Sequence, residues 1–378
     1  MGRKTSLIPF FGIDRQYATI REEILSAVDR VYSSGKVLDG DFTKIFENAI
    51  AKRCGRRYAV AVNSCTQALI FVNSYLMRNH YSDEFSPKIL LPGISFAATV
   101  NSVLMAACEP VFCDVDRNGL LNLESLDMSL DSIGIQAVTN VDLFGHVNDY
   151  DRLRMHLEFF NFNDVVVIED AAQSFGASYK GRPAGSLGDV SVLSFDPTKN
   201  LPNYGSGGMI LTDNPDLREY MLDIRNNGKL FEHTYVGTNS KISESDSAQM
   251  LVKLKHFDSW QARRREIAEY YQDSLHELSD DIEIIRPGED VESAWHKFVI
   301  RVDDRVSLYN FMNARGVEAR IHYPTALFDL PCLSSIPTSN SVVESLAFAQ
   351  ECISLPIYPE LTDAEIETVA ETVVSFYR

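Results

Sequence analysis

Basic residues are scarce in this chain of 378 residues, which has 35 Lys and Arg against 53 Asp and Glu. The resulting formal charge of −18 repels a polyphosphate backbone, so we expect no general nucleic-acid binding. A small anionic substrate is still compatible with this charge. A few local Arg, Lys and backbone N–H groups are enough to hold it.

Long apolar runs are also missing. No stretch is long enough to span a bilayer and no signal peptide is present, so we expect a cytoplasmic protein without a membrane partner. The six cysteines form no C-x-x-C pair and have no zinc-like spacing with histidine, so we expect no metal site. They are typical of small buried residues in a reducing compartment.

Two glycine-rich nucleotide motifs are absent. The chain has neither G-x-x-x-x-G-K-[ST], the phosphate loop of many NTPases, nor G-x-G-x-x-G after an early strand. The first absence argues against a P-loop enzyme, and the second against a dinucleotide-dependent oxidoreductase.

Hydrophobic residues make up 45% of the chain, enough for a full core and more than one domain. Up to Thr212, short apolar runs alternate with helix-like stretches, which predicts an α/β architecture. Runs such as 165–168 are apolar at successive positions, as in parallel strands covered by helices on both faces. The predicted strands are 59–62, 89–91, 107–113, 137–143, 165–169, 190–195 and 209–212.

The pattern changes after residue 245. A long helix is predicted over 247–278, followed by a strand over 297–302 and a helix over 306–315. A final helix begins at the capping box formed by Thr362 and Glu365. We therefore predict a large domain over residues 1–245 and a smaller C-terminal α+β domain over 246–378.

Two residues that could take part in catalysis follow predicted strands. Asp170 ends a buried strand, where open α/β sheets bind ligands, although a helix cap or a structural ion pair explains it equally well. Lys199 lies on a turn between Phe195 and a glycine-rich segment. Most lysines are solvated, but partial desolvation lowers the pKa of a lysine and makes it a nucleophile. Taken alone, the surface-lysine interpretation is the simpler one.

Two further segments have both a structural and a functional interpretation. Ser64 and Gln67 fit the N-cap of a helix, and such an N-terminus also binds phosphate. Phe96 follows a predicted strand and suits either the core or a stack on a cofactor ring.

Taken together, these segments resemble the DegT/DnrJ/EryC1/StrS family of sugar aminotransferases, which are pyridoxal 5′-phosphate (PLP) enzymes of fold type I. The most specific match is IEDAAQSFGASYKGRPAGSLGDVSVLSFDPTKN, residues 168–200. It contains an E-D-A-A-Q-x-x-G block, then G-x-x-G-x-x-G-D and S-F-x-P-x-K. Supporting matches are PGISFAATVNSV (92–103), DLFGH (142–146), IRNNGK (224–229), GTNSKISE (237–244), IHYP (321–324) and SLPIYP (354–359).

The resemblance implies a fold with a mostly parallel sheet and a role for each matching residue. Lys199 is expected to be the Schiff-base lysine of PLP, and Asp170 to keep the pyridinium nitrogen protonated. Gln173 matches the residue beside the ring hydroxyl, and Phe96 the aromatic residue on the ring face. The other implied positions are Ser64, Cys65, Thr66 and Ser194 for the phosphate, Asn239 for the phosphate across a homodimer interface, and His322, Tyr323 and Lys241 for the substrate.

The implied reaction moves an amino group from an amino acid, glutamate, to a keto sugar linked to a nucleoside diphosphate. The segments 197–201 and 251–271 are more similar to members that aminate C3 than to members that aminate C4. Three positions depart from the family pattern: Cys65 replaces a glycine, Ser206 an acidic residue, and Lys241 an arginine. These changes bear on cofactor and donor binding, because Gly permits close backbone approach and Arg binds bidentately.

Two other functions fit the same fold. One is a non-catalytic binding or regulatory protein, which the joint presence of Lys199, Asp170 and Gln173 argues against. The other is a sugar dehydratase, whose relatives have the lysine replaced. Amination at C4 remains the alternative within the aminotransferases.

Overall fold

A seven-stranded sheet lies at the centre of the computed structural model, which describes residues 7–80, 86–126, 134–334 and 342–378. Its strand order is β1-β9-β8-β5-β4-β2-β3. Strands β3, β2, β4, β5 and β8 are parallel, and β9 is antiparallel to both β8 and β1. The strands are β1 (Tyr58–Val62), β2 (Lys88–Pro92), β3 (Glu109–Cys113), β4 (Ala137–Val141), β5 (Val166–Asp170), β8 (Val190–Ser194) and β9 (Gly208–Thr212).

All seven predicted strands are present, with shifted ends. The strand predicted to begin at Ala107 begins at Glu109, because Ala107 has a φ of 59° in the turn after a helix. The strand predicted to end at Leu143 ends at Val141, since a 3-10 helix, η1 (Leu143–Gly145), follows and Phe144 has a φ of 61°. Both positive φ values are incompatible with a strand.

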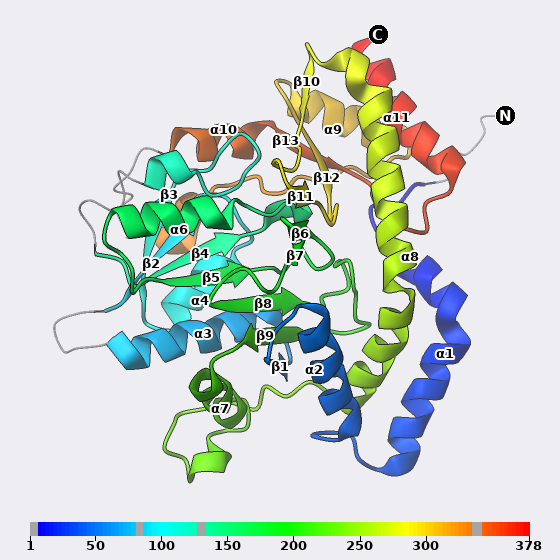
Figure 1. Ribbon diagram of the computed structural model, residues 1–378. Coiled ribbons are helices and arrows are strands. Elements are labelled where there is room, and N and C mark those ends of the chain that lie inside the picture. The colour runs from blue at the N-terminus through cyan, green and yellow to red at the C-terminus, as the bar shows by residue number, and fades with distance from the viewer. Residues whose placement is uncertain (1–6, 81–85, 127–133, 335–341) are drawn as a thin grey trace.

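Helices cover both faces of the sheet, because successive side chains of a strand point to opposite faces. In β2, Ile89 and Leu91 pack with one set of helices, whereas Leu90 packs with α6 (Tyr150–Phe159) on the other face. Figure 1 shows α6 and α3 on opposite sides of the sheet. The first set is α3 (Cys65–His80), α4 (Ala98–Met105) and α7 (Pro215–Ile224).

Helix α8 (Glu244–Leu275) runs along one side of the molecule (Figure 1). Its neighbours α1 (Ile13–Ser34) and α2 (Asp41–Arg53) belong to the N-terminal part of the chain, and α11 (Asp363–Tyr377) to the C-terminal part. The Ser243 hydroxyl caps α8 by accepting the N–H of Asp246 at 3.0 Å. The 3-10 helix η3 (His276–Leu278) completes the predicted helix of 247–278.

The C-terminal elements form a second apolar cluster. It surrounds a small sheet of order β10-β12-β13 and includes Ile8 from the N-terminal segment. Since α8 contributes to this cluster and also packs on α1 and α2, the division between residues 245 and 246 stays a prediction. The cluster is formed by α8 and α11 together with β10 (Ile282–Ile284), β12 (Phe298–Val302), α9 (Arg305–Ala314) and β13 (Cys352–Leu355). The C-terminal elements η4 (Leu327–Asp329), η5 (Pro331–Leu333) and α10 (Val343–Glu351) pack instead in the apolar cluster of the central sheet.

Short segments complete the described chain. A small sheet joins β6 (Ser178–Tyr179), β7 (Arg182–Pro183) and β11 (Val291–Glu292), and η2 (Lys229–Phe231) follows α7. Within the described ranges, no helix is both long and apolar enough to cross a membrane.

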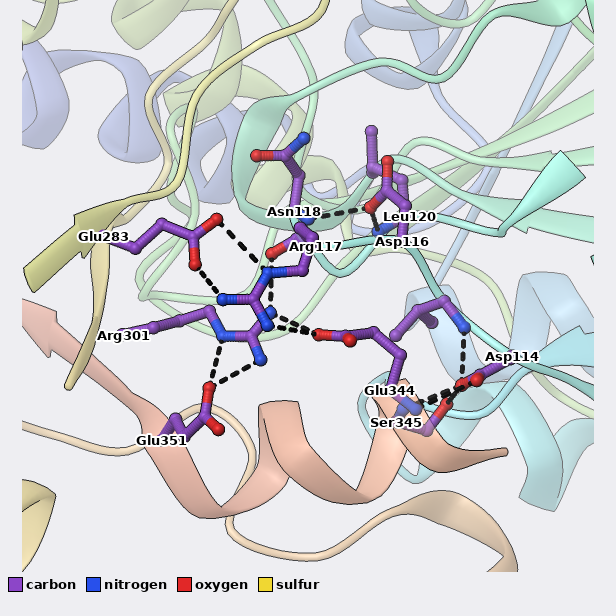
Figure 2. A network of polar contacts seen from close by, with 11 residues as sticks. Asp114, Asp116, Arg117, Asn118, Leu120, Glu283, Arg301, Glu344, Ser345 and Glu351 are labelled. Carbon is purple, nitrogen blue, oxygen red and sulfur yellow. Dashed lines mark hydrogen bonds and ion pairs between the residues drawn. The ribbon is translucent and has the colours of Figure 1, made fainter. Parts of the chain in front are cut away.

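A polar network joins α10 to the central sheet and to the β10-β12-β13 sheet. The Arg301 side chain, 1% exposed, donates to Glu351 at 2.6 and 2.8 Å and also pairs with Glu344. Asp114, just after β3, accepts the backbone N–H groups of Glu344 and Ser345 at 2.9 and 2.7 Å. Figure 2 shows Arg301 between the two glutamates and Asp114 at the start of α10. The network therefore anchors the C-terminal elements on the central sheet.

Candidate active site

A cavity of about 310 Å³ lies at the carboxyl ends of β4, β5 and β8. Open α/β sheets bind their ligands at this edge. A larger cavity of about 520 Å³ contains none of the predicted site residues. The smaller cavity is lined by ten of them: Ser64, Cys65, Thr66, Phe96, Asp170, Gln173, Ser194, Lys199, His322 and Tyr323.

Lys199 is half-buried on the turn after β8, where its N–H donates to the carbonyl of Asp196 at 2.9 Å. Its ammonium group has no hydrogen bond or ion pair with any residue that the structure describes. Desolvation lowers the pKa of Lys199, while the nearby Cys65, Asp170 and Asp196 act in the opposite direction. The geometry thus leaves an amine with a lowered pKa facing a cavity.

Asp170 ends β5 and is 4% exposed. Its carboxylate accepts the Ala172 N–H at 3.2 Å and the Thr99 hydroxyl at 3.3 Å. Burial raises the pKa of Asp170, whereas the Ala172 N–H, the charge of Lys199 and the Thr99 hydroxyl lower it. A cation brought next to this carboxylate would favour its charged form.

The N-terminus of α3 forms another wall. As predicted for an N-cap, the Ser64 hydroxyl accepts the Gln67 N–H at 3.1 Å. A Cβ atom on Gly208 of β9 would lie only 2.4 Å from the Ser64 carbonyl carbon, so only glycine lets β9 approach this loop. Burial raises the pKa of Cys65, so its thiol is neutral. The arrangement presents N–H groups and hydroxyls to an anion.

Gln173 and the segment 322–323 form a third group. The Gln173 side chain accepts the Phe144 N–H at 3.0 Å and donates to the Tyr323 hydroxyl at 3.3 Å. The Phe96 ring is 56% exposed and lies 6.1 Å from the Tyr323 ring. His322 contacts the Ser354 hydroxyl at 2.9 Å, and its peptide bond to Tyr323 is cis. Burial, with help from Lys297, lowers the pKa of His322 to about 2, so the ring is neutral.

Asn239 and Lys241 do not line this cavity. Asn239 is exposed and forms a backbone bridge with Asn226. The Lys241 ammonium donates to the Asn226 side chain at 2.8 Å and lies 3.8 Å from Asp39. Ser206, the third departure from the family pattern, does line the cavity.

Several residues that line the cavity were not predicted from the sequence. Thr99, which contacts Asp170, lies inside the matched segment 92–103, and Lys297 begins a predicted strand. Neither position carries a signal that distinguishes it from a structural residue. Further lining residues that were not predicted include Phe11, Ser95, Asp196, Thr198, His296 and Arg320.

These residues fit PLP. The cavity has an amine without a partner in the described part of the chain, a buried carboxylate and an anion-binding helix N-terminus. Fold and cavity together define a PLP-dependent aminotransferase of fold type I. The chain belongs to the DegT/DnrJ/EryC1/StrS aminotransferase family, whose sequence pattern matches residues 18–374.

The chain is similar to known proteins over almost its whole length. It is 31% identical to dTDP-3-amino-3,4,6-trideoxy-alpha-D-glucose transaminase of Streptomyces venezuelae, over 98% of this chain and 96% of that protein. It is 30% identical to a pleiotropic regulatory protein of Geobacillus stearothermophilus, over 98% and 99%. The crystal structure of S. venezuelae DesV, in complex with a ketimine intermediate, superposes with a TM-score of 0.90 at 30% identity, over 98% and 99%.

Proposed function

We propose that this protein transfers an amino group from glutamate to C3 of a keto sugar linked to a nucleoside diphosphate. The observation that carries the proposal is Lys199, whose amine faces the cavity that Asp170 also lines. The name of the S. venezuelae relative supports a nucleotide-linked 3-amino sugar as the product. The segments 197–201 and 251–271 support the same position.

In this proposal, PLP, when bound, supplies a ring that takes up electrons from the carbon bearing the amino group. Lys199 would hold the cofactor covalently through Nζ, and its amine would also be the base and acid that moves a proton to and from that carbon. The lowered pKa of Lys199 suits this role, because a neutral amine accepts the proton. Asp170 holds a proton on the ring nitrogen, with its carboxylate oriented by Thr99 and Ala172.

The phosphate group is assigned to the N-terminus of α3. Its hydroxyls and N–H groups suit an anion, and Ser194 lies on the same cavity. Cys65 contributes its backbone N–H there, since its thiol is neutral. Asn239 lies outside the cavity of its own chain, which supports a homodimer in which it reaches the phosphate bound to the second copy. Lys241, two residues after Asn239, is assigned to the substrate in the same second copy.

The remaining assignments concern orientation. Gln173, held by the Phe144 N–H, is placed beside the ring hydroxyl. Phe96 is placed on the ring face, and His322 and Tyr323 next to the sugar. A neutral His322 donates or accepts a single hydrogen bond with a sugar hydroxyl through its free ring nitrogen.

A non-catalytic regulatory role is the second candidate, because one relative is named a pleiotropic regulatory protein. Lys199 distinguishes the two roles: a binding protein needs no amine with a lowered pKa beside the ligand.

The test is the absorption spectrum of the PLP-loaded protein before and after glutamate. We expect the wild type to change from the aldehyde form to the amine form of the cofactor, and Lys199→Ala to lose turnover by about 10²-fold or more. Lys255→Met, on the exposed side of α8, is the matched control. Full turnover by Lys199→Ala would contradict the assignment. Rates with 3-keto and 4-keto nucleotide sugars then decide the position of amination.

A further inference from the structure

Lys297 is a buried lysine without a counter-ion among the described residues. It immediately precedes β12, is 4% exposed and borders the cavity. In the described parts of the chain its ammonium group has no hydrogen bond or ion pair, and it lies 5.2 Å from the ring centres of both Phe10 and Phe11. Two aromatic rings offset only part of the cost of desolvating an ammonium group. The site is therefore incomplete without a negatively charged or strongly accepting group.

The surroundings of Lys297 make an anion the expected complement. Burial and the nearby cations Lys199, Arg264 and Arg320 lower the pKa of Lys297, whereas Asp196 acts in the opposite direction. An anion bound next to Lys297 would favour its charged form. Asp196 already accepts the N–H and hydroxyl of Thr198 at 3.0 and 2.8 Å. Arg320 donates to Glu318 at 2.6 Å and stacks on Phe11.

The two histidines of this wall each have a hydrogen-bond partner. His296 contacts the Asn200 side chain at 3.1 Å, and His322 contacts Ser354. His322 keeps its second ring nitrogen for a ligand, whereas the ammonium group of Lys297 has no hydrogen bond or ion pair at all among the described residues. The cofactor phosphate is not that ligand in our assignment, because the phosphate belongs to the N-terminus of α3, on a different wall built from β1 and β9.

We propose that Lys297 binds a carboxylate of the amino-acid donor, an inference that rests on the proposed function. Every amino-acid donor brings a carboxylate into the cavity, whereas a sugar carries one only if it is oxidised. A carboxylate accepts a short, charge-assisted hydrogen bond from an ammonium group and supplies the missing charge. Lys297 is accordingly a specificity residue of the donor half-reaction.

The first test measures binding without turnover. Glutarate has the two carboxylates of glutamate and no amino group, so calorimetry with the PLP-loaded protein reports carboxylate recognition alone. We expect Lys297→Met to weaken glutarate binding by about 30-fold or more, since a buried charge loses its partner, and Lys297→Arg to restore part of the affinity. Lys255→Met should bind glutarate like the wild type, and circular dichroism checks that each variant is folded.

The second test separates the two half-reactions. In rapid mixing, Lys297→Met should raise the glutamate concentration for half-maximal rate by a similar factor, while the keto sugar reacts normally with the amine form. Equal glutarate affinities in the wild type and Lys297→Met would overturn the inference. A defect confined to the sugar half-reaction would also overturn it, because the carboxylate would then belong to the sugar. A wild type that binds glutarate but does not react with glutamate would refute the proposed donor reaction. The carboxylate site at Lys297 would still be supported by the binding data.

Discussion

At the scale of single residues, Lys253 of α8 holds the segment that follows Lys199 in place. Its side chain is buried in α8, donates to the Pro202 carbonyl at 2.7 Å and lies 3.3 Å from the centre of the Tyr204 ring. Burial lowers the pKa of Lys253 to about 7, with Glu360 acting in the opposite direction. The amine therefore fixes the chain three residues after Lys199 and titrates close to neutral pH.

The stability of the protein should rise with pH because of Lys253. An unfolded lysine keeps its proton up to about pH 10.4, whereas the folded one releases it near pH 7. Between these values the unfolded state binds more protons, so the free energy of unfolding increases by up to about 1.4 kcal/mol per pH unit.

The measurement is urea unfolding at several pH values from 7 to 10. The wild type should gain stability over this range relative to Lys253→Met, while Lys255→Met should follow the wild type. A constant difference between the wild type and Lys253→Met would show that Lys253 has the same protonation in both states.

Residues differ in how far the sequence reveals them. Lys199, Asp170 and Gln173 lie within one matched segment, so the sequence alone brings them together. Lys297 and Thr99 come from other elements and reach the cavity only through the packing of the C-terminal cluster and α4. No local sequence pattern predicts this packing. The proposed role of Asn239 needs a second chain, and only the resemblance of its segment to the family indicates that role.

At the scale of elements, α11 begins with the predicted capping box. The Thr362 hydroxyl accepts the Glu365 N–H at 3.3 Å, and the Glu365 carboxylate accepts the Thr362 N–H at 2.9 Å. The same carboxylate binds Arg15 of α1 through two contacts of 2.7 Å. One glutamate thus caps the N-terminus of α11 and ties it to α1, the first helix of the described chain.

Replacing the cap should destabilise the protein modestly. We expect Thr362→Ala to lower the free energy of unfolding by about 1 kcal/mol, because an N–H group at the start of α11 loses its acceptor. Thr368→Ala is the control, since Thr368 is exposed on the same helix and outside the box. Urea unfolding of both variants checks this, and equal stabilities would mean that Arg15 alone holds Glu365 in place.

Element types were more predictable than their arrangement. Apolar runs and capping residues indicate strands, α8 and α11, since those signals are local. The pairing of β1 with β9 joins segments separated by residues 63–207, and its antiparallel direction leaves no trace in either run. The two-residue strands β6, β7 and β11 are too short to show a period.

At the scale of the whole molecule, the proposal of a shared active site makes a clear prediction for mixed dimers. A hybrid of a Lys199→Ala chain with an Asn239→Ala chain contains one site with both native residues. If Asn239 acts across the interface of a C2 dimer, that hybrid should have about half of the wild-type activity. Both parent variants should have much less.

The hybrid is prepared with two affinity tags and purified in sequence. Its activity is compared with that of each parent and of a tagged wild-type dimer. Activity no higher than the average of the parents would place Asn239 in the site of its own chain.

The order of strands in the central sheet also affects how the chain is made. Strand β1 hydrogen-bonds only to β9 within the described sheet, and β9 is the last of the seven strands to be synthesised. At about 5–20 residues per second, roughly 7–30 s pass on the ribosome between the two. During that time the run Tyr-Ala-Val-Ala-Val has an unpaired backbone and an apolar surface, which is the state that chaperones recognise.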